Sequence, residues 1–267
     1  MPFVVLLMVG LIPVGATEVA ARPAVTIVDV DLATGKIAVD GPDRESASAP
    51  GSTLKPFILL TALRVGLVRP DTRVACTGTL RIAGRNLTCA HPSSLRILDA
   101  QEALAYSCNS YFARIAQQMP PLALQEGLQQ FGIHSVALAA SPNQRVLLAL
   151  GLDRVALTPL QLAHAYAELA RVLLQAGPQS ETVRAGLIDS VAYGMAHAAQ
   201  TSGLTLGGKT GTAHDPAPIL QHGWFAGIVF TSAAEAKATH VVVVYAPGGN
   251  GNDAATAAHV YMRSMHW

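Results

Sequence analysis

The strand-like segments of this chain lie at its two ends, and this arrangement limits the folds that it can adopt. Residues 24–30 and 36–39 flank a turn, which is typical of a β-hairpin. Residues 204–213, 223–230 and 240–245 form a second group, whose short connections favour antiparallel neighbours. We therefore predict an α+β fold in which both ends join one antiparallel sheet of about five strands, with helices packed on it.

The chain between these ends carries mainly helical patterns. The segment Thr158-Pro159-Leu160-Gln161 combines a cap, a first-turn proline and a glutamine that can complete a capping box. Similar signals predict helices after Asp99 and over residues 182–200, whereas residues 141–143 are interpreted as a proline-bearing loop. We expect an inserted all-helical subdomain over roughly residues 67–200.

Composition sets broad limits on the domain and its partners. The 267 residues carry a net charge of +1, and 51% of them are hydrophobic while 13% are charged. Such a chain can bury a substantial core as one large or two small domains. It contains no basic run and no internal repeat, so we predict no nucleic-acid partner.

The N-terminal segment is typical of an exported protein. Residues 3–12 are apolar, too short to span a bilayer well, and are followed by small residues at 14–16 and 19–21. We predict that residues 1–21 are a signal peptide or an N-terminal anchor, and that residues 22–267 form the mature domain. The alternative for the apolar run is a buried first strand.

The three cysteines are consistent with an exported protein. Cys76 and Cys89 flank a short turn-containing segment, and we predict a disulfide between them, with two free thiols as the alternative. A zinc site that uses His91 is disfavoured because no four-ligand spacing completes it. Cys108 is interpreted as a small packing residue. We therefore predict no metal.

The segment around Ser52 and Lys55 carries the first candidate chemistry. Pro50 and Gly51 mark a turn before the apolar run 57–63, and a helix that starts here would place the hydroxyl and the amine on one face. A serine becomes a nucleophile when a neighbouring base takes its proton. A capped helix with a solvent-facing lysine is the ordinary alternative. However, only four of the 18 Lys and Arg residues are lysines, which favours a site that needs a titratable amine.

A second candidate is the strand-like segment 207–213. Its small residues are typical of a strand that another backbone approaches closely, and Gly211 would let a peptide ligand lie along it. Lys209 and the hydroxyls of Thr210 and Thr212 would face a carboxylate. The residue pattern of a phosphate-binding loop also occurs here. Such a loop stands at the start of a helix, whereas this segment is strand-like.

A third motif, Ser107-Cys108-Asn109, stands between two predicted helices and gains weight from the other two. In chain order, Ser52-x-x-Lys55, Ser107-x-Asn109 and Lys209-Thr210-Gly211 resemble the motifs of penicillin-binding proteins and class A β-lactamases. The resemblance to the penicillin-binding protein transpeptidase domain covers nearly all of residues 24–267. Further segments similar to that family are 50–57, 107–112, 157–163 and 222–227.

The resemblance implies a fold, a substrate and a role for each motif residue. It implies the penicillin-binding protein/β-lactamase-like fold, peptidoglycan stem peptides ending in D-Ala-D-Ala as substrate, β-lactams as covalent inhibitors, no cofactor and a place in the periplasm or on the outer face of the cytoplasmic membrane. The implied catalytic roles are Ser52 as nucleophile, Lys55 as base and Ser107 as proton donor to the leaving group. Asn109 would bind the substrate, and the strand with Lys209, Thr210, Gly211 and Thr212 would bind its carboxylate. The backbone N–H groups of Ser52 and Thr212 would form the oxyanion hole.

Several departures keep other functions open. Cys108 replaces the Asp of the second motif, which weakens the resemblance to β-lactamases. No glutamate stands in a motif like the one that activates water in one lactamase class, whereas a carboxylated Lys55, as in another, stays open. The alternatives to a D,D-transpeptidase are a D,D-carboxypeptidase, a serine β-lactamase and a non-catalytic β-lactam or muropeptide sensor. We expect a catalytic domain without a glycosyltransferase or pedestal domain.

Overall fold

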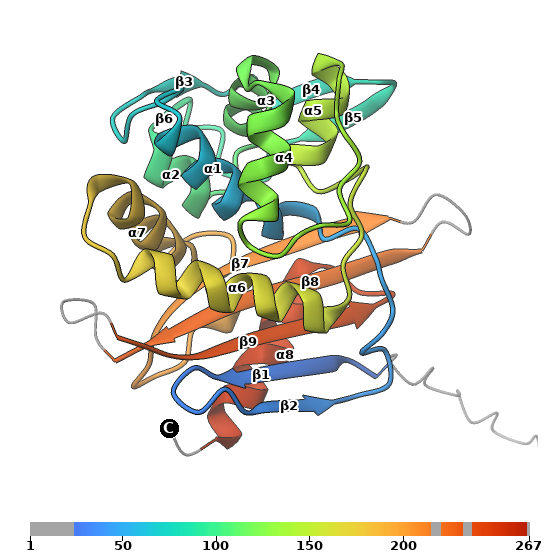
Figure 1. Ribbon diagram of the computed structural model, residues 1–267, viewed down its shortest axis with the longest axis vertical. Helices are drawn as coiled ribbons and strands as arrows, with labels where there is room; N and C mark the ends of the chain where they lie inside the picture. The colour runs from blue at the N-terminus through green and yellow to red at the C-terminus, as the bar shows by residue number, and fades with distance from the viewer. Residues whose placement is uncertain (1–23, 215–219, 232–236, 266–267) are drawn as a thin grey trace, which may run out of the picture.

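The computed structural model of the chain describes residues 24–214, 220–231 and 237–265 (Figure 1). The segment 1–21, predicted to be a signal peptide or anchor, lies outside the described residues. Within the described ranges, none of the helices combines the length and the apolar character that crossing a bilayer requires.

One five-stranded antiparallel sheet organises the molecule. Its strands lie in the order β2-β1-β9-β8-β7, so the N-terminal hairpin pairs with the C-terminal strands. The strand bounds are β1 (Thr26–Asp31), β2 (Ile37–Asp40), β7 (Thr205–His214), β8 (Gln221–Phe230) and β9 (Ala238–Pro247). In the central pair Val28 lies opposite Val243. The predicted joining of the two chain ends is confirmed.

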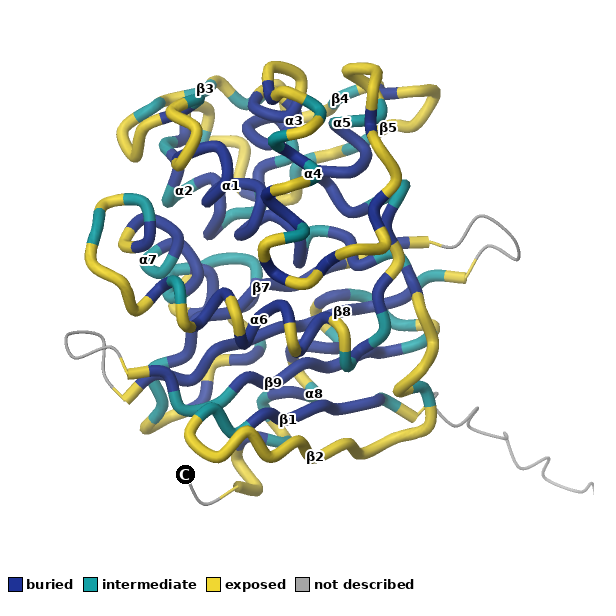
Figure 2. Tube along the Cα trace, in the orientation of Figure 1, coloured by how far each residue is buried: buried dark blue, intermediate teal, exposed yellow. Residues whose placement is uncertain are grey.

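Helices cover both faces of this sheet and give three layers. Helix α8 (Gly251–Ser264) passes behind the sheet, and α6 (Pro159–Leu173) crosses in front of it (Figure 1). Two separate apolar clusters fill the two interfaces. The central strands are buried along most of their length, whereas β2 is exposed at the edge (Figure 2). Strands β8 and β9 are therefore nearly continuous apolar runs, whereas a sheet buried on one face would show alternating apolar and polar residues.

The front layer continues into a mainly helical region. After the one-turn 3₁₀ helix η1 (Gly51–Leu54) come α1 (Lys55–Arg64), α2 (Ala100–Ala105), α3 (Asn109–Gln118), α4 (Pro121–Gln129), α5 (Pro142–Ala149), α6 and α7 (Pro178–Ala192). Two small two-stranded sheets accompany these helices: β3 (Val74–Ala75) with β6 (Ile97–Leu98), and β4 (Thr79–Ile82) with β5 (Arg85–Thr88). Residues 67–200 are thus mainly, but not wholly, helical.

One segment differs from the sequence prediction in kind. Residues 141–143 were interpreted as a loop, yet Ser141 caps α5 and Pro142 is its first residue. Ser141 Oγ accepts from the Gln144 backbone N–H while the Gln144 side chain accepts from the Ser141 N–H. This capping box, with proline where an N–H needs no partner, starts the helix.

Helix α7 differs from its predicted bounds of 182–200. It begins at Pro178 and ends at Ala192, and a separate 3₁₀ turn, η2 (His197–Ala199), follows. At Gly194 an added Cβ would lie 2.4 Å from the Ala105 carbonyl oxygen. The chain therefore leaves the helix where it meets the end of α2 at close range.

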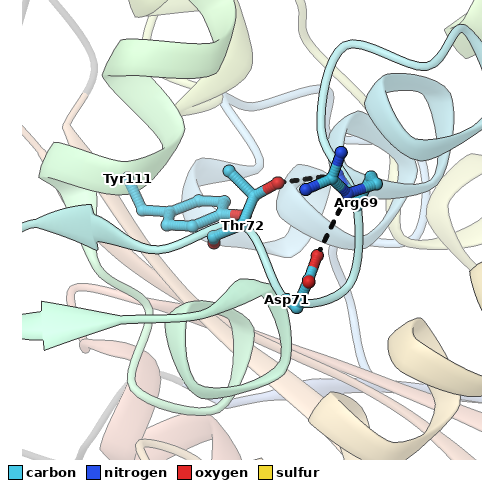
Figure 3. A network of polar contacts seen from close by, with 4 residues as sticks. All are labelled: Arg69, Asp71, Thr72 and Tyr111. Carbon is cyan, nitrogen blue, oxygen red and sulfur yellow. Dashed lines mark hydrogen bonds and ion pairs between the residues drawn. The ribbon is translucent and has the colours of Figure 1, made fainter.

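A small polar network fixes the connection that follows α1. The Arg69 backbone N–H donates to Thr72 Oγ1 at 2.8 Å, and the Tyr111 hydroxyl of α3 donates to the Thr72 carbonyl at 3.3 Å (Figure 3). The exposed Arg69–Asp71 ion pair adds little. The buried tyrosine therefore holds this loop against the helix that begins at Asn109.

The 3₁₀ turn η1 is held from several sides. The buried Tyr166 hydroxyl of α6 donates to the Thr53 carbonyl at 2.9 Å, and Trp224 Nε1 of β8 donates to the Ala49 carbonyl at 3.0 Å. Thr53 Oγ1 closes the turn by donating to the Pro50 carbonyl at 2.8 Å. The sheet and its main covering helix thus position residues 49–53.

We predict that Tyr166→Phe lowers the free energy of unfolding by about 1–3 kcal/mol, because it leaves the buried Thr53 carbonyl without this donor. Urea denaturation measures the change. The control is Tyr193→Phe, whose side chain is 52% exposed, so that water can replace any partner of its hydroxyl. Equal losses in the two variants would contradict this account of η1.

Candidate active site

The three sequence motifs meet at one cleft of about 210 Å³, which opens between η1, β7 and the loop before α3. The described residues that line it are Ser52, Thr88, Ala90, Tyr106, Ser107, Asn109, Met195, Thr210, Gly211 and Thr212. Lys55 and Lys209 are fully buried, and the contacts below link both amines to this cleft. All eight predicted catalytic and substrate-binding residues therefore belong to one neighbourhood.

Ser52 lies in η1 rather than at a helix cap. The structure begins α1 at Lys55, two residues later than a helix capped by Ser52 would begin, and η1 has no side-chain cap. Gly51 has a positive φ of 56°, and a Cβ there would lie 2.8 Å from the Thr212 carbonyl oxygen. Glycine is thus required for η1 to approach β7.

Lys55 contacts the second motif rather than the serine three residues before it. Its Nζ donates to the Ser107 carbonyl at 2.8 Å, to Ser107 Oγ at 3.1 Å and to Asn109 Oδ1 at 2.7 Å. Within the described part of the chain, Ser52 is not among its hydrogen-bond partners. The sequence placed Lys55 beside Ser52, and the structure adds that the lysine fastens α1 to the loop before α3.

Ser107 lies between the two buried amines. Lys209 Nζ donates to Ser107 Oγ at 2.9 Å and to the Thr210 carbonyl at 3.1 Å, so the hydroxyl connects Lys209 with Lys55. Ser107 also has a positive φ of 55°. Such backbone costs energy for a residue with a side chain and is concentrated at functional sites.

Burial changes the acidity of both amines. Removal from water lowers the pKa of Lys55 to about 7, against the opposing influence of Cys108 and Cys89. Burial, followed by the charge of Lys55, lowers the pKa of Lys209 well below its usual value. These lysines can therefore be neutral amines near pH 7.

Strand β7 packs closely on η1. At Gly211 an added Cβ would lie 2.4 Å from the Pro50 carbonyl oxygen, so the missing side chain makes room for the turn that carries Ser52. Thr212 Oγ1 accepts from the Gly251 backbone N–H at 2.9 Å, which ties β7 to the start of α8. The glycine that was expected to admit a ligand thus also has a packing role inside the molecule.

Sequence reasoning missed part of the cleft wall. Asn109 Nδ2 donates to the Thr88 carbonyl at 2.9 Å, which joins the end of β5 to the second motif. Thr88, Tyr106 and Met195 line the cleft but carry no motif, and only their place in the fold identifies them.

The cysteines differ from the predicted pairing. Cys76, Cys89 and Cys108 are free in the structure, so the expected Cys76–Cys89 disulfide is absent from it. The sulfurs nevertheless gather in one place, and Cys89 Sγ lies 3.9 Å from Cys108 Sγ. Cys108, interpreted from sequence as a packing residue, is buried beside them.

Comparisons with known proteins identify the family of this chain and support its fold. The family model "Penicillin binding protein transpeptidase domain" matches residues 43–266, so the chain belongs to that family. Penicillin-binding protein 3 of Bacillus subtilis (strain 168) is 26% identical over an alignment of 226 residues, and the match covers 67% of this chain and 34% of that protein. The chain thus spans about a third of the length of this curated relative.

Solved structures share the fold. The D,D-transpeptidase domain of a peptidoglycan glycosyltransferase from Eggerthella lenta superposes with a TM-score of 0.73 at 22% identity, over 92% of this chain and 78% of that one. The transpeptidase domain of penicillin-binding protein 3 from Burkholderia pseudomallei gives a TM-score of 0.74 at 21% identity, over 91% and 88%. The predicted penicillin-binding protein fold is confirmed.

We predict that the free energy of unfolding rises with pH above about 7, partly because of Lys55. Between about 7 and its ordinary pKa of 10.5, this lysine holds a proton in the unfolded chain but not in the folded one. One such proton contributes up to about 1.4 kcal/mol per pH unit. Lys55→Met should therefore flatten the rise in denaturation experiments from pH 7 to 9.

The matched control is Lys36→Met, because Lys36 is exposed beside β2 and its replacement should leave the slope unchanged. The charge of Lys55 also lowers the pKa of Lys209, so the flattening in Lys55→Met includes the loss of that effect, whereas Lys36→Met leaves both buried lysines as they are. A Lys55→Met protein with the wild-type slope would contradict a neutral Lys55.

Proposed function

We propose that this protein is a serine D,D-transpeptidase, which cross-links peptidoglycan stem peptides that end in D-Ala-D-Ala through an acyl-enzyme. The observation that carries the proposal is the hydroxyl of Ser107 held between two buried lysine amines, at a cleft that Ser52 lines. This arrangement supplies a nucleophile, a base of suitable acidity and a proton relay in one place.

In the first step, Ser52 attacks the carbonyl of the penultimate D-Ala. Its hydroxyl needs a base, and Lys55, with a pKa of about 7, can take the proton near neutral pH. The backbone N–H groups of Ser52 and Thr212 form the oxyanion hole, because η1 packs closely on β7 and both residues line the cleft. Binding the oxyanion there favours the tetrahedral intermediate over the substrate.

The proton then travels to the leaving group. Ser107 Oγ is 3.1 Å from Lys55 Nζ and 2.9 Å from Lys209 Nζ, so it can accept a proton from Lys55 while it donates one to the departing D-Ala amine. The C–N bond breaks as the amine is protonated, and the ester on Ser52 remains. A second amine, from another stem peptide, reverses these transfers and forms the cross-link.

Substrate recognition uses the remaining motif residues. One N–H of the Asn109 amide is bound to Thr88, which leaves the second for the carbonyl of the stem peptide. Lys209, Thr210 and Thr212 provide positive charge and hydroxyls for the terminal carboxylate. Since stem peptides are cross-linked outside the cytoplasmic membrane, the proposal also places the protein there.

Two observations favour acyl transfer to an amine over hydrolysis by a β-lactamase. The described residues that line the cleft include no Asp or Glu to activate water. The three groups around Lys55 Nζ are oxygens, among them the carbonyl of Ser107, which can only accept a hydrogen bond. They fit an amine that donates, whereas a carboxylated lysine would direct its own oxygens at them.

We predict that a fluorescent penicillin labels the wild-type protein covalently and that Ser52→Ala abolishes the labelling, because no ester can form. Gel fluorescence after denaturation measures the bound label. The control is Ser202→Ala, at an exposed serine outside the cleft, which should label like the wild type. Equal labelling of Ser52→Ala and wild type would mean that Ser52 is not the nucleophile.

We also predict that nitrocefin is opened about once per protein molecule and then only slowly, because the acyl-enzyme lacks an activated water. The absorbance burst, divided by the protein concentration, gives the stoichiometry. Rapid turnover of many nitrocefin molecules per protein would instead identify a β-lactamase.

A further inference from the structure

Four metal-binding side chains converge beside the cleft, and the proposed function assigns a role to none of them. Cys76 follows β3, Cys89 follows β5, His91 lies two residues later, and Cys108 immediately precedes α3. One ligand atom from each residue can be chosen so that all four lie within 4.8 Å of one another. Three separate stretches of backbone thus bring three sulfurs and one imidazole close together.

The orientation of His91 favours a ligand role. Its Nδ1 lies 3.1 Å from the Pro92 carbonyl, which can only accept, so this nitrogen carries the hydrogen. The other nitrogen, Nε2, then presents its lone pair, and it is buried without a hydrogen-bond partner among the described residues. Metal-binding histidines are oriented in the same way, with the second nitrogen donating to a carbonyl. The side chain is only 9% exposed, so water does not readily satisfy that lone pair.

The spacing of the sulfurs suits a tetrahedral ion. With zinc–sulfur distances of about 2.3 Å, two sulfurs of a tetrahedron lie about 3.8 Å apart. The Cys89 and Cys108 sulfurs are separated by 3.9 Å. The Gly78 backbone N–H donates to Cys76 Sγ at 3.3 Å, and the Ser110 hydroxyl lies 3.5 Å from the same sulfur. The Gly78 N–H would stabilise a thiolate at Cys76.

We propose that Cys76, Cys89, His91 and Cys108 form a structural zinc site. Three thiolates and one neutral imidazole are a closed four-ligand set of the type that holds structural Zn²⁺, and soft sulfur ligands exclude Mg²⁺ and Ca²⁺. On binding, the three thiols release three protons, and the ion with its three thiolates carries one net negative charge. No oxidant or reductant takes part.

The site joins both sides of the cleft wall. Cys108 stands between Ser107 and Asn109, and Cys89 follows Thr88, whose carbonyl accepts from Asn109. A bound ion would therefore fasten the end of β5 to the loop that carries the second motif. We expect the metal to fix the position of Ser107 relative to Lys55, a consequence that rests on the proposed function.

The rival arrangement is a disulfide, and it explains less. Any one bridge uses two sulfurs and leaves the third sulfur and the unpartnered His91 Nε2 in the same small space. A zinc ion accounts for all four groups together. The two arrangements also differ in the number of thiols that can be counted in unfolded protein.

The first test uses the wild-type chain, produced without metal-affinity resin and reconstituted with Zn²⁺. We expect about one zinc per chain by elemental mass spectrometry after dialysis, and three titratable thiols after denaturation with a chelator and without reductant. Folded protein that retains no zinc, or protein with only one titratable thiol, would overturn the proposal. Neither measurement depends on a variant that folds.

The second test identifies the ligands. His91→Ala should weaken zinc binding by more than about tenfold, since changing even an outer partner of a metal ligand costs 10–100-fold. His134→Ala, at an exposed histidine away from the cluster, is the matched control and should bind zinc like the wild type. The Co²⁺ form of the wild type should show the absorption of tetrahedral cobalt–thiolate bonds. Undiminished zinc binding in His91→Ala would contradict the ligand set.

A third measurement separates this proposal from the proposed function. Removing the zinc with a chelator should lower the melting temperature and slow labelling by fluorescent penicillin, and added Zn²⁺ should restore both. If zinc binds as described but penicillin never labels the protein, the proposed function fails while the metal site stands. If chelation changes neither melting temperature nor labelling in zinc-loaded protein, the structural role of the metal is refuted.

Discussion

The site depends on two lysines that the fold buries completely and links through one serine hydroxyl. Lys55 comes from α1, Lys209 from β7 and Ser107 from the loop before α3, so three distant parts of the chain meet through their hydrogen bonds. Two buried amines that share one hydroxyl as hydrogen-bond partner cannot both stay charged without a large cost in free energy. The fold therefore holds at least one of them ready to accept a proton. Close approaches of the backbone at Gly51 and Gly211 bring Ser52 to the same place.

Much of the fold could be predicted because the period of the apolar residues changes along the chain. The capping boxes at Asp99 and Thr158 marked the starts of α2 and α6, and the strand patterns marked all five strands of the sheet. Helix α5 was missed because residues 141–143 were interpreted as a proline-bearing loop, although Ser141-Pro142 begins a helix when Gln144 completes the cap. A Ser-Pro pair can begin a turn or a helix, and the residue three positions after the serine distinguishes the two.

The motif residues of the site were also predictable, but their contacts were not. Short-range spacing placed Lys55 beside Ser52, whereas its hydrogen bonds go to Ser107 and Asn109, more than fifty residues away. The same limit hid the cluster of three cysteines and one histidine that we propose as a zinc site. Spacing alone offered three ligands, and the fourth, Cys108, comes from a different element and follows His91 by a stretch that contains α2. Long-range contacts of this kind leave no periodic trace in a sequence.

The central claim is that the active site around Lys55, Ser107 and Lys209 transfers an acyl group from Ser52 to an amine. Mass spectrometry of the protein with a stem peptide ending in D-Ala-D-Ala, with and without an acceptor amine, tests it most directly. The account predicts release of D-Ala together with a cross-linked product that appears only when the acceptor is present. Release of D-Ala without any cross-linked product would identify a carboxypeptidase, and intact stem peptide in both samples would contradict acyl transfer altogether.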